Sequence, residues 1–319
     1  MKRPRRAEGE PGDVSAVVLG ATGFLGRHIC SRLTAVGFRV HRISRNAGAS
    51  AAGLVNEAVV EAEPDVVVNA AGCVWSGTDK EMEAANTRLV TELLPRLAEL
   101  PHRTRLVQLG TVHEYGPVGP GMALTEQHPT HPDTVYGRTK LRAAQHVLRA
   151  TGEELVEGVV LRVSNALGPG MPRGSLVGGI ARRLGEHAAA RDAASELVLR
   201  LSSVRAYRDF VDVRDVAGAA TAAAVAPGEV VRGRIINVGS GRTVLVRQLV
   251  DRLIELSHVP CRVEAVDAVG GGAAQTRAAW QQMDISRSRE LLGWQPAVGA
   301  DASLRDLLAE TMPRDVRRS

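Results

Sequence analysis

Residues 14–26 read Val-Ser-Ala-Val-Val-Leu-Gly-Ala-Thr-Gly-Phe-Leu-Gly. The apolar run from Ala16 to Leu19 is typical of a buried strand in a parallel sheet. The run opens into three glycines, and an amphipathic stretch follows at 24–36. Strand, glycine turn and helix in this order are the context in which a glycine motif predicts a dinucleotide site. The spacing is G-x-x-G-x-x-G, which differs from the G-x-G-x-x-G dehydrogenase fingerprint.

The three glycines of this motif have separate roles. Gly20 allows the tight turn, Gly23 lets the backbone approach a pyrophosphate, and Gly26 lets the helix pack on the strand. The helix N-terminus then receives the phosphate charge. The residues expected to contact the cofactor here are Gly20, Thr22, Gly23, Phe24, Leu25 and Gly26.

Strand-like and helix-like segments alternate along most of the chain. Apolar runs predict strands near 15–19, 38–43, 65–69, 105–109, 157–163 and 235–238. Helical patterns lie between them, near 24–36, 79–98, 134–150 and 213–225. This alternation predicts an α/β fold with a Rossmann-type, doubly wound parallel sheet.

The alternation of strand-like and helix-like segments ends at about Asn165, where several Gly and Pro residues predict a loop. We expect a disordered basic tail at 1–12 and a dinucleotide-binding Rossmann domain formed by 13–164 with 207–240. A smaller, mostly C-terminal substrate lobe would then comprise 165–206 with 241–319. A substrate should bind between this lobe and the carboxyl edge of the sheet.

Composition narrows the function classes. Four of the 40 basic residues lie in 1–6, which leaves 36 basic against 35 acidic residues and argues against a nucleic-acid-binding face. No run approaches the ~18 apolar residues of a membrane span, and the basic head lacks the apolar segment of a signal peptide. Three cysteines without a C-x-x-C pair are typical of reduced thiols, so we expect a cytoplasmic protein. His128 and His131 have no carboxylate or Cys at ligand spacing, and no metal site is predicted.

Tyr136 lies four residues before Lys140 in a chain with only three Tyr and three Lys. Residues i and i+4 share one face of a helix. The ammonium would then lower the pKa of the phenol and make Tyr136 an acid or base near neutral pH. The alternative is a surface Tyr beside a solvated Lys.

The end of the second predicted strand bears on the choice of cofactor. An Asp or Glu there binds the 2′-hydroxyl of NAD, whereas Arg accommodates the 2′-phosphate of NADP. This chain reads Val-His-Arg-Ile-Ser-Arg-Asn at 40–46, without an acid. Ser44, Arg45 and Asn46 therefore favour NADP(H), with NAD(H) as the alternative. These residues could also be ordinary loop residues.

Several motifs together resemble the extended short-chain dehydrogenase/reductase family, specifically its nucleotide-sugar epimerases, dehydratases and ketoreductases. The resemblance covers about residues 14–296. Within the family, 106–117 and the Arg-rich, Lys-poor composition are most similar to dTDP-4-keto-6-deoxyhexose 4-ketoreductases of deoxysugar pathways in antibiotic-producing actinomycetes. The motifs are Gly-Ala-Thr-Gly-Phe-Leu-Gly (20–26), Asn-Ala-Ala-Gly (69–72), Leu-Gly-Thr-Val-His-Glu-Tyr-Gly (109–116), Tyr-Gly-Arg-Thr-Lys (136–140), Leu-Arg-Val-Ser-Asn-Ala-Leu-Gly-Pro-Gly (161–170), Arg-Asp-Phe-Val-Asp-Val-Arg-Asp-Val-Ala (208–217), Asn-Val-Gly (237–239) and Leu-Gly-Trp-Gln-Pro (292–296).

The resemblance implies a catalytic set. The Thr111 hydroxyl would hydrogen-bond the sugar carbonyl, and Tyr136 would donate a proton to the developing alkoxide. Lys140 would hold the nicotinamide ribose. Thr111 could instead be a strand-end residue that satisfies backbone groups. Further residues that the resemblance places along the cofactor are Ala70, Ala71, Gly72, Asn86, Leu109 and Ser164.

The resemblance also implies a dTDP-sugar substrate and, by itself, a homodimer. Asn165 and Arg208 would hold the diphosphate, because a guanidinium can bind two oxygens at once. Arg208 could instead pair with Asp209 or Asp212. His113 would either contact the sugar or cap a loop.

The function implied is NADPH-dependent reduction of the keto group of a dTDP-4-keto-6-deoxyhexose. A nucleotide-sugar 4-epimerase with tightly held NAD is the alternative. A dehydratase is disfavoured, since Val112 and His113 replace the Asp-Glu pair of its elimination chemistry. A cofactor-sensing protein without catalysis is the third reading, and such proteins often lose the Tyr or Lys that this chain keeps.

Overall fold

The computed structural model describes residues 14–44, 58–74, 78–190, 195–202, 204–266 and 280–313. The predicted tail at 1–12 lies outside these ranges, as do Arg45 and Asn46. No helix in the described part of the chain is both long and apolar enough to cross a membrane.

Within the described residues, six parallel strands form the central sheet in the order β2-β1-β3-β4-β5-β9. Nearly every residue of the inner strands is buried, because helices cover both faces. The predicted Rossmann-type parallel sheet is confirmed. Its strands are β1 (Ser15–Leu19), β2 (Arg39–Ile43), β3 (Val66–Asn69), β4 (Arg105–Thr111), β5 (Glu157–Val163) and β9 (Ile235–Val238).

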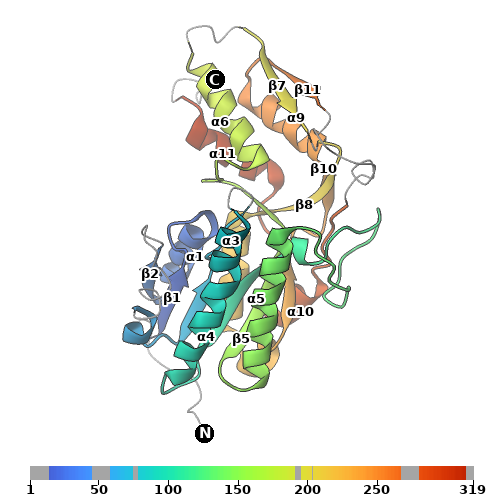
Figure 1. Cartoon of the computed structure of the whole chain (residues 1–319). Helices are drawn as coiled ribbons and strands as arrows, with labels where there is room; N and C mark the ends of the chain where they lie inside the picture. The colour runs from blue at the N-terminus through green and yellow to red at the C-terminus, as the bar shows by residue number, and fades with distance from the viewer. Residues whose placement is uncertain are drawn as a thin grey trace.

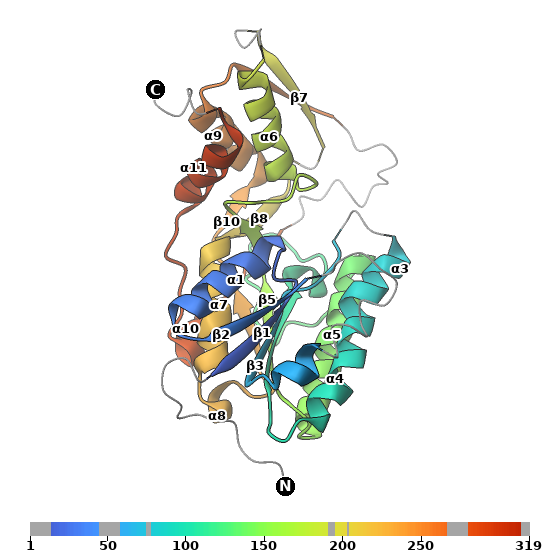
Figure 2. The same ribbon diagram turned by 90° about the vertical axis from the view of Figure 1, so that its left-hand side faces the viewer.

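Two helix layers enclose this sheet, as Figure 2 shows. One layer contains α1 (Phe24–Ala35) and α7 (Val213–Val225), and the other contains α4 (Leu89–Glu99) and α5 (Val135–Gly152). The helix predicted at 79–98 is divided into α3 (Asp79–Met82), the π-helix η1 (Glu83–Arg88) and α4. Two shorter helices are η2 (Val112–Glu114) and α8 (Gly228–Val231), and residues 58–62 are also helical.

A smaller lobe lies beyond the carboxyl ends of the strands (Figure 1). Its apolar core joins three helices to a parallel pair of strands, β7 and β11. A three-stranded sheet, β10-β8-β6, lies between the lobe and the central sheet. The elements are β6 (Asn165–Leu167), α6 (Leu176–Ala188), β7 (Leu197–Leu201), β8 (Tyr207–Asp212), β10 (Thr243–Leu245), α9 (Val246–Ser257), β11 (Cys261–Ala265) and α11 (Ala300–Thr311).

The division of the chain differs from the predicted one in two places. The helix α10 (Ser286–Leu292) and Trp294 were assigned to the lobe, but Trp294 belongs to the core under α7 and donates to the Asp215 carbonyl at 3.0 Å. The strand β8 was assigned to the Rossmann domain, yet it pairs with β6 and β10. Amphipathic patterns identify a buried face, but they do not say which core receives it.

Candidate active site

Thr111 ends β4 and begins the turn η2. Its hydroxyl accepts from the His113 N–H at 3.4 Å, and the Glu114 carboxylate accepts from the Thr111 N–H at 2.8 Å. This reciprocal pair is a capping box. It fixes Thr111 at the carboxyl edge of the sheet.

The helix α5 begins directly against this turn. The Thr134 hydroxyl caps it by accepting from the Gly137 N–H at 3.0 Å. A Cβ at position 137 would lie 2.5 Å from the His113 carbonyl oxygen, so only glycine permits this approach. The approach brings Tyr136 into a side-chain hydrogen bond with Thr111.

Lys140 lies one turn further along α5 and is only 5% exposed. The alternative of a solvated surface pair is therefore wrong. The structure brings together the three predicted catalytic residues, Thr111, Tyr136 and Lys140, where β4 meets α5.

The predicted acidification of Tyr136 by Lys140 is also wrong for the protein alone. Burial raises the pKa of Tyr136 to about 12, with the hydrogen bond to Thr111 opposing and the charge of Glu114 adding to the rise. Burial lowers the pKa of Lys140 to about 8, and Glu114 opposes that fall. Desolvation is the largest cause of the shift at both residues. Tyr136 consequently keeps its proton near neutral pH, which suits a proton donor.

His113 faces Tyr136 with ring centroids 5.9 Å apart and ring planes at 66°. Burial lowers the pKa of His113 to about 4, assisted by the charge of Arg208 and opposed by Asp133. The imidazole is thus neutral at pH 7. Arg208 reaches this neighbourhood from β8, and its guanidinium donates to the Tyr207 carbonyl at 3.1 Å.

The two carboxylates suggested as partners of Arg208 take other donors. Asp209 accepts from the backbone N–H groups of Ser240 at 2.7 Å and Met283 at 3.1 Å. Asp212 accepts from the Arg214 guanidinium at 2.8 Å. The nearby charge of Asp133 also acts on Arg208, and the role of Arg208 toward a diphosphate stays a prediction.

The glycine turn has the geometry that a dinucleotide requires. Gly20 adopts φ +76°, and a Cβ there would lie 2.8 Å from the Ala71 backbone. A Cβ at Gly26 would lie 2.0 Å from the Gly20 carbonyl oxygen. Within the described residues, no side chain caps the start of α1 at Gly23. Thr22 and Gly23 are exposed, so the turn is open to a ligand, while the Gly23 N–H itself donates to the Gly20 carbonyl at 2.9 Å.

Four of the residues predicted to contact the cofactor follow the strands on either side of this turn. Ala70, Ala71 and Gly72 follow β3 beside the turn, while Ser44 follows Ile43, whose carbonyl accepts from the Gly20 N–H at 2.8 Å. The Leu109 side chain is only 3% exposed and packs in the core, and its contact with the cofactor stays a prediction.

Asn86 forms hydrogen bonds to two segments that are distant in the sequence. Its carbonyl oxygen accepts from the Cys73 N–H at 2.9 Å, and its amide donates to the Cys73 carbonyl and to the Thr139 hydroxyl, each at 3.0 Å. Asn86 thereby ties the loop after β3 to α5, one residue before Lys140. It lies in the π-helix η1, which a periodicity of 3.6 does not reveal.

Ser164 and Asn165 join β5 to neighbouring elements. The Ser164 hydroxyl donates to Asp209 at 3.2 Å. The Asn165 amide donates to the Asp209 carbonyl and to Gln281, each at 2.9 Å. Both amide hydrogens of Asn165 therefore go to protein acceptors, which argues against its predicted role as a donor to a diphosphate.

Two buried carboxylates were missed by sequence reasoning, namely Glu114 and Asp209, both 0% exposed. Each adjoins a predicted site residue, in His-Glu-Tyr-Gly and in Arg-Asp-Phe. The Thr111-x-x-Glu114 spacing is that of a capping box and could have pointed to Glu114, whereas Arg162 lies 48 residues from Glu114 and Ser240 lies 31 residues from Asp209.

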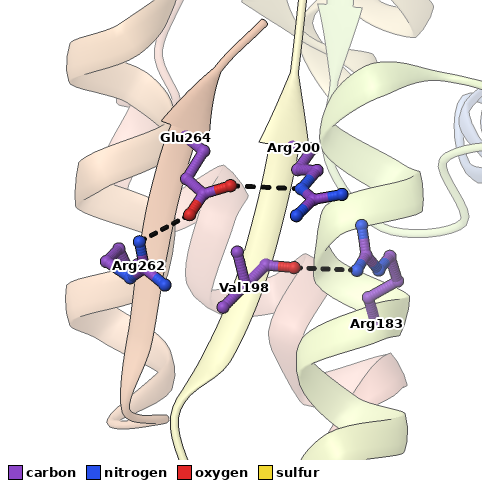
Figure 3. A pocket seen from close by; sticks show the side chains of 5 residues that line it. All are labelled: Arg183, Val198, Arg200, Arg262 and Glu264. Atoms are coloured by element: carbon purple, nitrogen blue, oxygen red, sulfur yellow. Dashed lines mark hydrogen bonds and ion pairs between the residues drawn. The ribbon is translucent and has the colours of Figure 1, made fainter.

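A separate hollow of about 340 Å³ lies in the lobe (Figure 3). Its lining residues include none of the predicted site residues: Arg183, Val198, Arg200, Arg262 and Glu264. Glu264 pairs with Arg200 at 3.1 Å and with Arg262, so these exposed charges satisfy one another. Among the described residues, no group of three His, Cys, Asp or Glu is arranged to hold a metal.

Comparison with known proteins gives consistent matches. The model of the NAD dependent epimerase/dehydratase family matches residues 16–239. The chain is 39% identical to dTDP-6-deoxy-L-talose 4-dehydrogenase (NAD(P)(+)) from Kitasatospora kifunensis, over 91% of this chain and 93% of that protein. It is 25% identical to GDP-6-deoxy-D-mannose reductase from Pseudomonas aeruginosa, over 92% and 95%. The solved structure of RMD from Pseudomonas aeruginosa with NADPH superposes with a TM-score of 0.80 at 22% identity, over 93% and 98%.

Proposed function

The chain belongs to the NAD dependent epimerase/dehydratase family, as its motifs predicted, and we propose that it reduces the 4-keto group of a dTDP-4-keto-6-deoxyhexose with NADPH. One observation carries the proposal: Thr111, Tyr136 and Lys140 converge at the end of β4. The similarity to a 4-dehydrogenase over nearly the whole chain supports the position of the reacting carbon. That relative is named for oxidation, and the same groups serve both directions of one reversible reaction.

The cofactor would lie along the glycine turn. Backbone N–H groups at the start of α1 would hold its pyrophosphate, and Lys140 would hold the ribose next to the nicotinamide. When bound, the dinucleotide supplies the hydride that the carbonyl carbon receives. Ser44 and Arg45 favour NADP(H), in keeping with a relative named for NAD(P)(+) and a structural neighbour with NADPH. NAD(H) is the alternative.

The side chains of the protein handle the proton. The Thr111 hydroxyl donates a hydrogen bond to the carbonyl oxygen and orients it. Tyr136 keeps its proton because its pKa lies near 12, and it releases that proton when the same oxygen gains negative charge. Lys140 supplies positive charge to this buried site.

Two groups from different elements would recognise the substrate. The neutral His113 lies against Tyr136 and would contact the sugar. Arg208, on β8 between the lobe and the sheet, would bind the diphosphate with its planar guanidinium. The dTDP moiety, a role in antibiotic sugar formation, a homodimer and a cytoplasmic location stay predictions.

The 4-epimerase alternative uses the same Tyr136 and Lys140, so the test follows the cofactor. The purified protein is denatured and the released nucleotide identified. Fresh enzyme then receives NADPH and a dTDP-4-keto-6-deoxyhexose. Little bound nucleotide with NADPH consumed mole for mole supports the reductase. Tightly bound NAD with no net NADPH consumption would replace it by the epimerase, and binding of NADPH without any turnover would favour the cofactor sensor.

A further inference from the structure

Glu114 forms a fully buried ion pair directly beneath the catalytic groups. Its carboxylate accepts from the Arg162 guanidinium at 2.8 Å on one oxygen and from the Thr111 N–H at 2.8 Å on the other. The two side chains are 0% and 3% exposed. A charge withdrawn from water in this way is tolerated only when it is paired. Each of the two charges is therefore needed to keep the other one stable in this buried position.

The surrounding structure is fitted to this carboxylate. A Cβ at Gly110 would lie 2.5 Å from a Glu114 oxygen, so glycine makes room for it. The Arg162 guanidinium lies 4.5 Å from the centre of the Tyr115 ring, whose hydroxyl donates to Asn237 at 2.7 Å. These contacts hold both charges in place between β4 and β5.

We propose that Glu114, held by Arg162, is a positioning residue that fixes Thr111 beside Tyr136 and places a buried negative charge under the catalytic groups. The role concerns the proton transfer of the proposed reductase and rests on that function. Glu114 itself contacts neither sugar nor cofactor in this account. Glu114 acts through the hydrogen bond that it accepts from the Thr111 N–H, and through the electrostatic field of its carboxylate.

The groups on which the Glu114 charge acts are Arg162 of β5 and Tyr136 and Lys140 of α5. The two titratable neighbours in its own turn have further charged partners: Arg208 of β8 and Asp133 before α5 act on His113, and Arg162 and Glu126 act on Tyr115. The Glu114 charge acts on both members of the proton-transfer pair and raises the pKa of each. Its loss should lower both pKa values, so the alkaline limit of activity should move to lower pH.

Two substitutions separate charge from geometry. Glu114→Gln keeps an oxygen to accept from the Thr111 N–H but removes the charge. We expect the alkaline limb of kcat to shift down by about one pH unit, with KM for NADPH unchanged. Glu114→Asp keeps the charge but shortens the reach to Thr111. We expect kcat to fall about tenfold without a shift of the limb.

The matched control is Glu157→Gln, which breaks the ion pair of the partly buried Glu157 with the buried Arg105, at the opposite end of β4 and β5. It should lower stability without moving the pH profile. An equal shift in Glu157→Gln and Glu114→Gln would reduce Glu114 to a structural residue and overturn the proposal.

A second readout needs no turnover. The chain has three lysines, Lys2, Lys80 and Lys140, so biosynthetic incorporation of ¹³C-labelled lysine gives a few resolved NMR signals. The Lys140 signal is identified by its loss in Lys140→Arg. It should titrate near pH 8 in the wild type, lower in Glu114→Gln, and unchanged in Glu157→Gln. Unchanged Lys140 titration in Glu114→Gln would sink the inference while leaving the reductase assignment intact. A shifted Lys140 titration in a protein that fails to consume NADPH would support the role of Glu114 and contradict the reductase assignment.

If Glu114→Gln alone does not fold, Arg162→Met is added to it. The double variant leaves no buried charge unpaired, and such replacements are often tolerated. Because the Glu114 charge is what acts on Lys140, the same downward shift is expected. An unshifted double variant would count against the proposal in the same way.

Discussion

Two Arg–Glu ion pairs lie at opposite ends of β4 and β5: Arg105–Glu157 joins the two strands directly, and Arg162–Glu114 joins β5 to η2, the turn after β4. At the amino ends, Arg105 meets Glu157 at 3.0 Å and also donates to the carbonyls of Ala223 at 2.9 Å and Ala226 at 3.0 Å. This pair ties the sheet to the end of α7. At the carboxyl ends, Arg162 meets Glu114 under Thr111.

The comparison shows that the role of an Arg–Glu ion pair depends on the end of the parallel sheet at which it lies. All strands of such a sheet end at one edge, and their following loops gather there. An ion pair at that edge acts on the reacting groups, whereas one at the other edge only holds strands and helices together. Substitutions at the two ends of β4 and β5 should therefore have different effects.

The largest expected effect is at the carboxyl end. Tyr136→Phe removes only the phenolic hydroxyl, and its ring still packs against His113. We expect kcat to fall about 10³-fold, because loss of a general acid has this size of effect. NADPH affinity should stay within about twofold, measured by fluorescence titration. Turnover within severalfold of the wild type would remove Tyr136 from the role of proton donor.

At the amino end, Arg105→Met should affect stability and leave chemistry alone. It deprives Glu157 and two helix-end carbonyls of their donor, and breaking a buried pair costs about 3 kcal/mol. Urea unfolding should show that loss, with kcat of the folded enzyme unchanged. A changed pH profile of kcat would erase the contrast between the two ends.

Arg45, which lies outside the described residues and follows β2 by two positions in the sequence, bears on the choice of cofactor. If it reads the 2′-phosphate, Arg45→Ala should weaken NADPH binding about tenfold and NADH binding much less. Calorimetric titration with each nucleotide gives the ratio. Equal losses for the two nucleotides would show that Arg45 does not select the cofactor.

The smallest effect is expected at His113. Its pKa near 4 leaves it neutral above about pH 5, so it should add no limb to the pH profile between about pH 5 and 8. His113→Gln should therefore raise KM for the sugar severalfold at every pH in that range. A limb near pH 6.5 that disappears in His113→Gln would mean that His113 titrates and transfers a proton.

Much of the sheet could be predicted because its strands carry the simplest pattern. The strands β1, β5 and β9 begin and end where predicted, since continuous apolar runs are typical of strands buried on both faces. The break of one predicted helix at η1 could not be foreseen. A π-helix there turns Asn86 toward Cys73 and Thr139, and these contacts depend on tertiary structure.

The sequence predicted the three catalytic residues of the site, but it did not predict their pKa values or the buried carboxylate beside them. Thr111, Tyr136 and Lys140 were found through motifs, and the structure brings them together. The sign of the Tyr136 shift was wrong, because an i, i+4 pair in the sequence carries no information on burial. Glu114 was overlooked because an acid in a sequence is most often solvated, and its Arg162 partner lies 48 residues away.

The most direct test of the whole account follows the hydrogen itself. NADPH carrying deuterium in its transferable position is incubated with the enzyme and a dTDP-4-keto-6-deoxyhexose, and the product is examined by mass spectrometry and NMR. We predict one deuterium per product molecule, located at C4 of the sugar, and none with Tyr136→Phe over the same time. A converted sugar without deuterium would contradict the account, because the hydride would then have come from a nucleotide retained by the protein.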